Sequence, residues 1–281
     1  MAIATYTAYK NKVAAKQAPS FFTKASVTFN GINSAWNTAW TSAPDAGVVP
    51  TATARVCTSQ TLGALLASSQ TPLRTPMTAK FWLAQMELQI AAASNRTNSG
   101  IFMLVDRMAD ILPSATANAT VTPIANLALT GMVPTRWTTG EGVMAALQCI
   151  TVIAGAPQLT IGYTNQAGTA GKTSQILVPS ASQALSIIPF SLADGDYGLQ
   201  SIQSYNVTTA GTTGQFGLVL YKPLAIFGMP RSYDNPGYRE LLDSGNLCEL
   251  HPDSCLEIWS YNLATSTASG LIMGNLGIIE G

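Results

Sequence analysis

The pattern that most constrains the fold is a series of short segments in which apolar and polar residues alternate. The segments QLTIGYTN (158–165), KTSQILVP (172–179) and LQSIQSYNVT (199–208) follow this pattern. A period of two is typical of β-strands with one buried face. The connections QAGTAG and LADGDYG are rich in residues that favour turns. The region therefore predicts a hairpin with a long loop and then a further strand, with a β-bulge at the one slip in LQSIQSYNVT.

Comparable segments extend this β pattern toward both ends of the chain. We expect strands in IFMLVDRM, VMAALQCITVIA, SQALSIIPF, CLEIWSYNLAT and GLIMGNLGII, and a strand pair in QFGLVLYKPLAIFG. About eight short strands joined by Gly/Thr turns predict a mainly β protein, a β-sandwich with a jelly roll as one version. KFWLAQMELQIAAAS mixes helix and strand formers, and SQTLGALLAS fits either a helical turn or a buried strand, so both stay open.

The ends of the β pattern suggest how the chain is divided. The first two dozen residues carry Lys10, Lys12, Lys16 and Lys24 without a clear apolar period, which predicts an extended arm or a short, loose helix. We expect two short helices, at 33–40 and 238–242, the second within a charged loop. The predicted division is an N-terminal arm and irregular segment at 1–55 and a β-sandwich domain at 56–281, with a loop insertion at 229–254.

Charge is scarce for a chain of 281 residues. Only 10% of the residues are charged, and 14 basic residues balance 14 acidic ones, whereas about 25% is usual. A polar but weakly charged surface is easily desolvated, which favours association with partners. We therefore expect a surface that is covered in an assembly, the alternative being a secreted domain with a Thr/Ser-rich coat. The balanced charge argues against a nucleic-acid partner.

Neither a signal peptide nor a membrane helix is expected from the sequence. The N-terminal MAIATYTAYKNK lacks the apolar core of a signal peptide. The most apolar stretch, 142–163, is interrupted by Gly155, Pro157 and Gln158 and fits two strands better than a membrane helix. We expect no membrane partner.

The single histidine limits the catalytic chemistry that the chain can support. Most Ser or Cys hydrolases need a histidine base, and His251 is the only one; no G-x-S-x-G motif surrounds any serine. Cys248, His251 and Cys255 could begin a zinc site, with Cys57, Cys149 or a carboxylate as a fourth ligand. The spacing follows neither a finger nor a ribbon pattern. The prediction is therefore an ordinary loop histidine and free, buried thiols, with no metal, cofactor or catalytic residue assigned.

Three further motifs resemble ligand sites but are better explained by ordinary structure. Gly171-Lys172-Thr173 resembles the end of a P-loop, but Gln166 occupies the place of the first glycine and a strand pattern follows. Asp194-Gly195-Asp196 lacks the later ligands of a calcium loop and predicts a turn. Asp106, Arg107 and Asp110 could pair carboxylates for acid-base chemistry, but we expect a surface salt bridge.

The tryptophans and the Asn-x-Thr motifs have similar ordinary explanations. Trp36, Trp40, Trp82, Trp137 and Trp259 could form a sugar-binding platform, but their scatter predicts core or interface positions. The glycosylation motifs at Asn95, Asn118 and Asn206 are expected to be idle without a signal peptide.

The hairpin YTNQAGTAGKTS and the weakly charged Thr/Ser/Gly strands after it resemble virion structural proteins of tailed bacteriophages. The resemblance extends over roughly residues 100–281 and is nearest to capsid decoration or cement proteins, which are β-rich, often trimeric and seated on the outer shell between capsomers. It implies that the chain is made in the host cytoplasm and lies on the capsid surface. Its partners would be the major capsid protein and copies of itself, with a trimer favoured. No residue of this chain matches a specific family motif.

Three functions follow, from two classes of protein. The first is a capsid decoration protein, and the second is a major capsid or tail/neck subunit. The third, of a different class, is a glycan- or receptor-binding β-sandwich. In each case we expect a structural or binding protein and not an enzyme.

Overall fold

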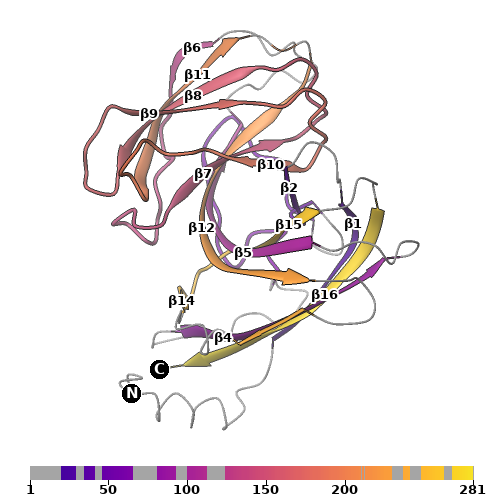
Figure 1. The fold of residues 1–281 in the computed structure, drawn as a ribbon. Coiled ribbons are helices and arrows are strands. Elements are labelled where there is room, and N and C mark those ends of the chain that lie inside the picture. Colours follow the sequence, from indigo (N-terminus) through magenta and orange to yellow (C-terminus); the bar gives the residue numbers. More distant parts are fainter. Residues whose placement is uncertain are drawn as a thin grey trace.

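The computed structural model describes residues 20–29, 35–41, 46–65, 81–92, 100–112, 124–209, 211, 213–229, 237–240, 248–262 and 268–280. Within these ranges the chain forms strands, turns and bends but no helix. The mainly β prediction is therefore confirmed (Figure 1). No helix of the described part is long and apolar enough to cross a membrane.

The strands form three sheets that the ribbon shows as successive layers (Figure 1). The first sheet contains β1 (Ser20–Phe29), β4 (Phe81–Ala92), β13 (Gly237–Glu240), β14 (Cys248–Leu250) and β16 (Ala268–Glu280). The second contains β2 (Trp36–Thr38), β3 (Arg55–Val56), β5 (Gly100–Ile111), β7 (Met144–Cys149), β10 (Ser186–Pro189), β12 (Phe216–Met229) and β15 (Leu256–Asn262). The third contains β6 (Ile124–Ala128), β8 (Gln158–Asn165), β9 (Lys172–Leu177) and β11 (Leu199–Thr209).

The middle sheet closes into a barrel. Its strands follow the order β12-β7-β10-β2-β15-β5, and β5 pairs back with β12 along nearly its whole length. Closure leaves these strands without free edges over the paired stretches. Each of the six contributes to a single apolar cluster, which identifies the inside of the barrel: Met103, Val105, Ala146, Ile187, Val219, Tyr221 and Trp259, with Trp36 and Met144 against them.

A bulge in β5 decides which of its side chains enter the barrel. Leu220 lies opposite Ala109 but Tyr221 lies opposite Arg107, so Met108 is an extra residue in β5. Because cross-strand partners share a face, Arg107 points inward with Tyr221. Asp110, opposite Val219, also points inward, whereas Asp106 points out of the barrel wall. Without the bulge, positions 107 and 110 would lie on opposite faces.

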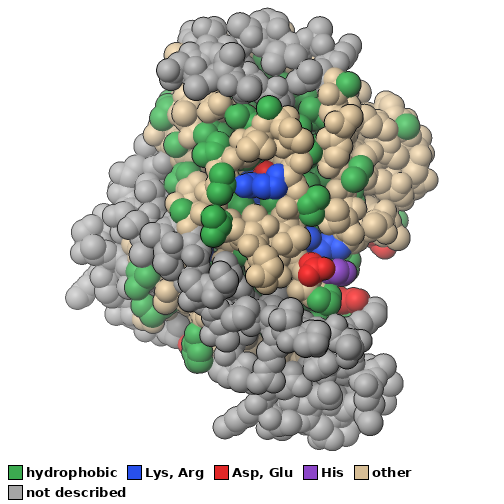
Figure 2. Space-filling view, turned by 180° about the vertical axis from the view of Figure 1, so that it is seen from behind, with side chains coloured by type: hydrophobic (Ala, Val, Ile, Leu, Met, Phe, Trp, Pro, Cys, Tyr) green, Lys and Arg blue, Asp and Glu red, His purple; other side chains and the backbone are tan. Residues whose placement is uncertain are grey.

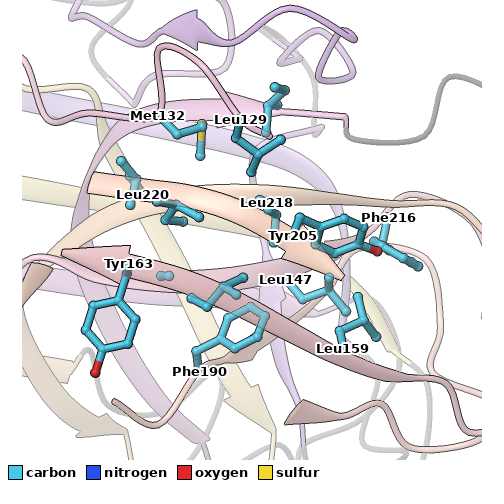
Figure 3. Packing of buried hydrophobic residues seen from close by; sticks show 14 of the residues in the cluster. Leu129, Met132, Leu147, Leu159, Tyr163, Phe190, Tyr205, Phe216, Leu218 and Leu220 are labelled. Carbon is cyan, nitrogen blue, oxygen red and sulfur yellow. The ribbon is translucent and has the colours of Figure 1, made fainter. Parts of the chain in front are cut away.

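The outer wall of the barrel is covered on two sides by the other sheets. Toward the first sheet, Phe102, Leu104 and Ile258 pack with side chains of β4 and β16, such as Met86 and Leu276. The largest core lies toward the third sheet, where side chains of β7 and β12 meet those of β8 and β11 (Figure 3). Both flanking sheets thus bury one face against the barrel, the layered arrangement typical of β proteins.

Several strand predictions are confirmed in detail. QLTIGYTN forms β8 and pairs with β9 as the expected hairpin, with Tyr163 opposite Lys172 next to the loop. Residues of β8 alternate between buried and half-buried. The slip in LQSIQSYNVT corresponds to register shifts in β11, as predicted.

Other expectations are wrong. QFGLVLYKPLAIFG is one strand, β12, and not a strand pair; Pro223 is tolerated there because it lies beyond the residues that pair with β7, and Leu224 is bulged. Within the short helix expected at 33–40, residues 36–38 form β2 instead, because strand pairing outweighs local propensity; residues 33 and 34 lie outside the described part. Within 238–242, residues 238–240 belong to β13; 241 and 242 lie outside the described residues.

The open alternatives are also settled where the chain is described. KFWLAQMELQIAAAS forms β4 up to Ala92, and residues 59–65 of SQTLGALLAS form turns and bends. Residues 20–24 of the expected arm belong to β1, which pairs with β16, while residues 1–19 lie outside the described part. The division at residue 55 stays a prediction.

Candidate functional site

Asp106, Arg107 and Asp110 lie at the centre of a buried charge network, and the expected surface salt bridge is wrong. All three residues are 0% exposed, because Arg107 and Asp110 point into the closed barrel and the loops at 136–137 and 254–255 cover Asp106. The network also recruits Arg55, Arg136 and Glu257 from distant parts of the chain. Three arginines thus face three carboxylates at one end of the barrel, which makes this cluster the most chemically distinctive feature of the described chain.

Asp106 holds the outer half of the network together. Its carboxylate accepts hydrogen bonds from both nitrogens of one edge of the Arg136 guanidinium, with Nε at 2.8 Å from Oδ2. It also accepts from Trp137 Nε1 at 3.1 Å, Ser254 Oγ at 2.9 Å and the Cys255 amide at 2.9 Å. Every partner is a donor, and the bonds join β5 to two loops far away in the sequence. This arrangement leaves the carboxylate fully engaged and suits a structural function.

Arg107 organises the inner half. Its guanidinium donates to Asp110 Oδ2 through Nε at 3.1 Å and Nη2 at 2.7 Å, and Nη2 also donates to Gln148 Oε1 at 2.9 Å. Nη1 lies 3.4 Å from Glu257 Oε2. The guanidinium stacks 4.2 Å from the centroid of the Trp40 ring, a cation–π contact made in a desolvated setting. Arg107 therefore connects β5, β7 and β15 across the barrel.

Asp110 links this interior to the surface through a second arginine. Arg55 donates to Asp110 Oδ1 at 3.0 Å through Nε, and its Nη2 also reaches the Val48 carbonyl at 3.0 Å. Its side chain is 21% exposed, whereas that of Asp110 is fully buried. Two arginines share one carboxylate, so the negative charge of Asp110 is offset from both the inside and the outside of the barrel.

Burial and charge act in opposite directions on Glu257. Desolvation raises the pKa of its carboxyl, and the nearby Arg107 guanidinium opposes that rise. The pKa of Arg107 is raised by Asp110 and Glu257 against its own desolvation, so it stays charged. On balance the pKa of Glu257 is raised. Its partner Arg107 is shared with Asp110, and only the Nη1 atom of that guanidinium faces Glu257, at 3.4 Å.

This direction predicts how Glu257 affects stability with pH. A carboxyl with a raised pKa binds its proton more tightly in the folded state than in the unfolded state. The protein therefore becomes more stable as the pH falls from above the pKa of the folded state toward 4.5, the pKa of the unfolded state. The free energy of unfolding of the native protein, minus that of Glu257→Gln, should therefore increase from pH 7 to pH 5. Urea denaturation at three pH values measures this difference. A difference that shrinks in acid would mean that Arg107 depends on the carboxylate form.

Cys248, His251 and Cys255 are not brought together into one site. Cys255 is buried beside Cys57 and Trp40, whereas His251 is exposed and its Nδ1 accepts a hydrogen bond from the Asp253 amide at 3.2 Å. Cys248 is half-buried, and Cys149 lies in the core between the barrel and the third sheet. In the described part of the chain, no group of three or more His, Cys, Asp or Glu side chains is placed to hold a metal ion.

The thiols should be unreactive in the folded protein. Desolvation raises the pKa of Cys57, Cys149 and Cys248 to about 12, and that of Cys255 well above its usual value. Since the thiolate is the reactive form, titration with Ellman's reagent at pH 8 should label none of the four within minutes in the native state and all of them in guanidinium chloride. Rapid native labelling of Cys57, Cys149 or Cys255 would contradict the buried arrangement; half-buried Cys248 is the first expected to react.

The remaining motifs also have structural explanations. Residues 166–171 form the β8–β9 loop, where Gly168 and Gly171 have positive φ values of 79° and 75°. Residues 194–196 form the expected turn, and Asp196 accepts hydrogen bonds of 2.7 Å from both Tyr163 and Asn165. These contacts anchor the 191–198 loop on β8. They provide a closed hydrogen-bond network and no arrangement for phosphate or calcium.

The tryptophans have divergent positions. Trp40 and Trp259 are completely buried, Trp36 packs against Tyr261, and Trp137 lies under Lys222, whose Nζ is 3.9 Å from the ring centroid. The described tryptophans therefore form no shared platform. The prediction of core positions is confirmed for Trp40 and Trp259, whereas Trp36, Trp82 and Trp137 are half-buried.

Few of the charged side chains whose burial is described are exposed. Lys24, Asp106, Arg107, Asp110, Arg136 and Glu257 are all buried. Among charged side chains whose burial is described, only Glu141, Asp194 and Asp253 are largely exposed. Large exposed apolar side chains are distributed over all three sheets and their loops: Phe21, Val48, Val49, Val56, Leu62, Ile101, Val133, Val152, Leu177, Tyr197 and Ile226. Figure 2 accordingly shows a face that is mostly uncharged where it is described.

The fold and the buried network thus define a mainly β protein with a closed barrel between two sheets. No protein-family model matches the chain, and no curated protein matches its sequence. Among solved structures, one of the infectious bursal disease virus Gx strain aligns with 94% of this chain and 82% of that chain, at 10% identity and a TM-score of 0.21. The VP2 subviral particle of the same virus aligns over 94% and 81%, at 10% identity and a TM-score of 0.19. Scores this low carry no functional argument.

Proposed function

We propose that this chain is a virion structural protein and, within that class, a capsid decoration or cement protein that stabilises the shell. The observation that carries the proposal is the weakly charged surface of the described residues: five of the six side chains of the charge network are buried, and the exterior mixes polar and apolar side chains. Such a surface has a low desolvation cost when a neighbour covers it. Repeated copies on a symmetric shell would then add weak contacts into strong attachment.

The interior supports the same proposal, because a shell component needs rigidity more than mobility. Six strands close the barrel, and the charge network joins β3, β5, β7 and β15 at one end. Asp106 is fully engaged by donors, and the buried thiols are held protonated. These groups stabilise the fold and offer no exposed nucleophile or base, in keeping with a structural function.

Assembly of the purified full-length chain tests the proposal. For a decoration protein, sedimentation and electron microscopy should show small closed oligomers, with a trimer expected, that bind bare capsids of the encoding virus and raise their disruption temperature. Spontaneous shells would instead indicate a major capsid protein, and tubes a tail protein. A chain that neither assembles nor binds capsids would overturn the virion proposal.

Surface variants locate the covered face with matched controls. Phe21, Val56 and Leu177 are exposed by 62%, 46% and 61% and belong to the first, second and third sheets, respectively. Each change to lysine should leave the melting temperature nearly unchanged, because exposed positions contribute little to folding. At least one should reduce assembly or capsid binding tenfold or more, and the other two then serve as its controls. If all three variants assembled and bound capsids like the native protein, the result would count against a β surface that is covered by a neighbour.

The alternative from another class is a glycan- or receptor-binding protein. Tyr197 is 60% exposed at a loop of the third sheet, the one observation that favours it. A glycan array with the full-length protein, compared with Tyr197→Ala, separates the two functions. Binding that depends on Tyr197 would support the alternative, and no binding would weaken it.

A further inference from the structure

Three polar atoms inside the barrel have no hydrogen-bond partner in the protein. They are Gln148 Nε2, Glu257 Oε1 and Trp259 Nε1, on residues that are at most 1% exposed. Leaving a buried donor or acceptor unpaired costs roughly 1–3 kcal/mol, and such groups are nearly always satisfied by protein or by ordered water. Three in one barrel therefore indicate a bound partner.

The side chains that carry these three atoms all point into the barrel. Gln148 lies opposite Ile187 and Glu257 opposite Val105, and both of these partners are in the interior cluster, as is Trp259. The other oxygens of Gln148 and Glu257 face the same guanidinium, that of Arg107. Trp259 is close enough to Glu257 to lower the pKa of that carboxyl without forming a well-oriented hydrogen bond.

Rotation of these side chains does not remove the problem. If the Gln148 amide flipped, its NH2 group would face Arg107 Nη2, a donor against a donor, and the 2.9 Å hydrogen bond would be lost. Rotating Glu257 merely exchanges its two oxygens. The Trp259 ring packs against Tyr221, with their centroids 4.3 Å apart, which fixes its N–H direction. Turning these side chains therefore does not give the three atoms a partner within the protein.

The chemistry of the site selects the class of ligand. Two N–H donors and the adjacent Arg107 disfavour a cation, and the Glu257 carboxyl disfavours an anion. A small neutral molecule that both accepts and donates hydrogen bonds fits all three groups. Water accepts two hydrogen bonds and donates two, so it can satisfy Gln148 and Trp259 and donate to Glu257.

We propose that the barrel interior contains a structural water site formed by Gln148, Glu257 and Trp259. The water connects β7 to β15, which are not neighbours in the barrel because β10 and β2 lie between them. It complements Arg107, which spans the same two strands. This inference does not depend on the proposed function.

A high-resolution crystal or neutron structure of the full-length protein tests the site directly. The expected result is one ordered water within hydrogen-bond distance of Gln148 Nε2 and Glu257 Oε1. Direct contact between these two groups, or an ion at the position, would overturn the proposal.

A substitution that inverts the polarity of the site gives an independent test. In Glu257→Gln, the amide oxygen can accept from Arg107 while its NH2 faces the site, which then presents three donors and suits a halide. At constant ionic strength, replacing gluconate by chloride should raise the melting temperature of Glu257→Gln by about 2 °C and leave the native protein unchanged. An equal chloride response in both proteins would show that the native site binds an anion and would overturn the proposal. Should the variant not fold, the structure of the native protein decides.

Discussion

Replacing Arg107 by methionine should lower the free energy of unfolding by about 3–5 kcal/mol, the range for removing one partner of a buried ion pair. Methionine retains much of the apolar stem but not the guanidinium, so Gln148 Oε1 and Glu257 Oε2 lose the donor that faces them. The stacking contact with Trp40 is also lost. Urea denaturation followed by tryptophan fluorescence and circular dichroism measures the change, with the m-value checking that the transition remains two-state.

Arg55→Met is the matched control, because Arg55 contacts the same carboxylate from a partly exposed position. Its side chain is 21% exposed, and solvent screens its interaction with Asp110, so a loss of about 1 kcal/mol is expected. The double variant Arg107→Met/Glu257→Met removes both charges and should recover part of the loss, since apolar replacement of a whole buried pair is often neutral. If Arg107→Met costs no more than Arg55→Met, the interior network contributes little to stability.

The fold could be predicted from the sequence where the pattern is local. The β8–β9 hairpin follows from strict alternation in QLTIGYTN and a glycine-rich loop, and the β11 bulge follows from a slip in the same alternation. The segment of β12 was expected to form a strand pair, but the chain continues as one strand through Pro223. The strand can contain this proline because no β7 residue pairs with it. Barrel closure depends on pairing between β5 and β12, more than 100 positions apart, for which a single sequence contains no local signal.

The charge network was only half visible for a related reason. Asp106, Arg107 and Asp110 stand out in an apolar strand, yet their burial depends on closure of the barrel and on two loops far away in the sequence. The Met108 bulge reverses the alternation, so counting in twos from Arg107 places Asp110 on the wrong face. Arg136 and Gln148 gave no signal, because their partners are brought close only by the folded chain. Glu257, which stands between apolar residues in CLEIWSYN, was a further hint of a buried carboxylate.

Asp106→Asn should destabilise the protein by about 3–5 kcal/mol, although it preserves the shape of the side chain. Arg136 donates to both oxygens of Asp106, so on either side an amide NH2 must face Arg136 together with Trp137 or the Cys255 amide, none of which can accept a hydrogen bond. The substitution also leaves the buried Arg136 without its carboxylate. Asp253→Asn, the same change on an exposed side chain of a neighbouring loop, should stay within about 0.5 kcal/mol. Equal urea midpoints for the two variants would show that the Asp106 hydrogen bonds do not hold the 254–255 and 136–137 loops on β5.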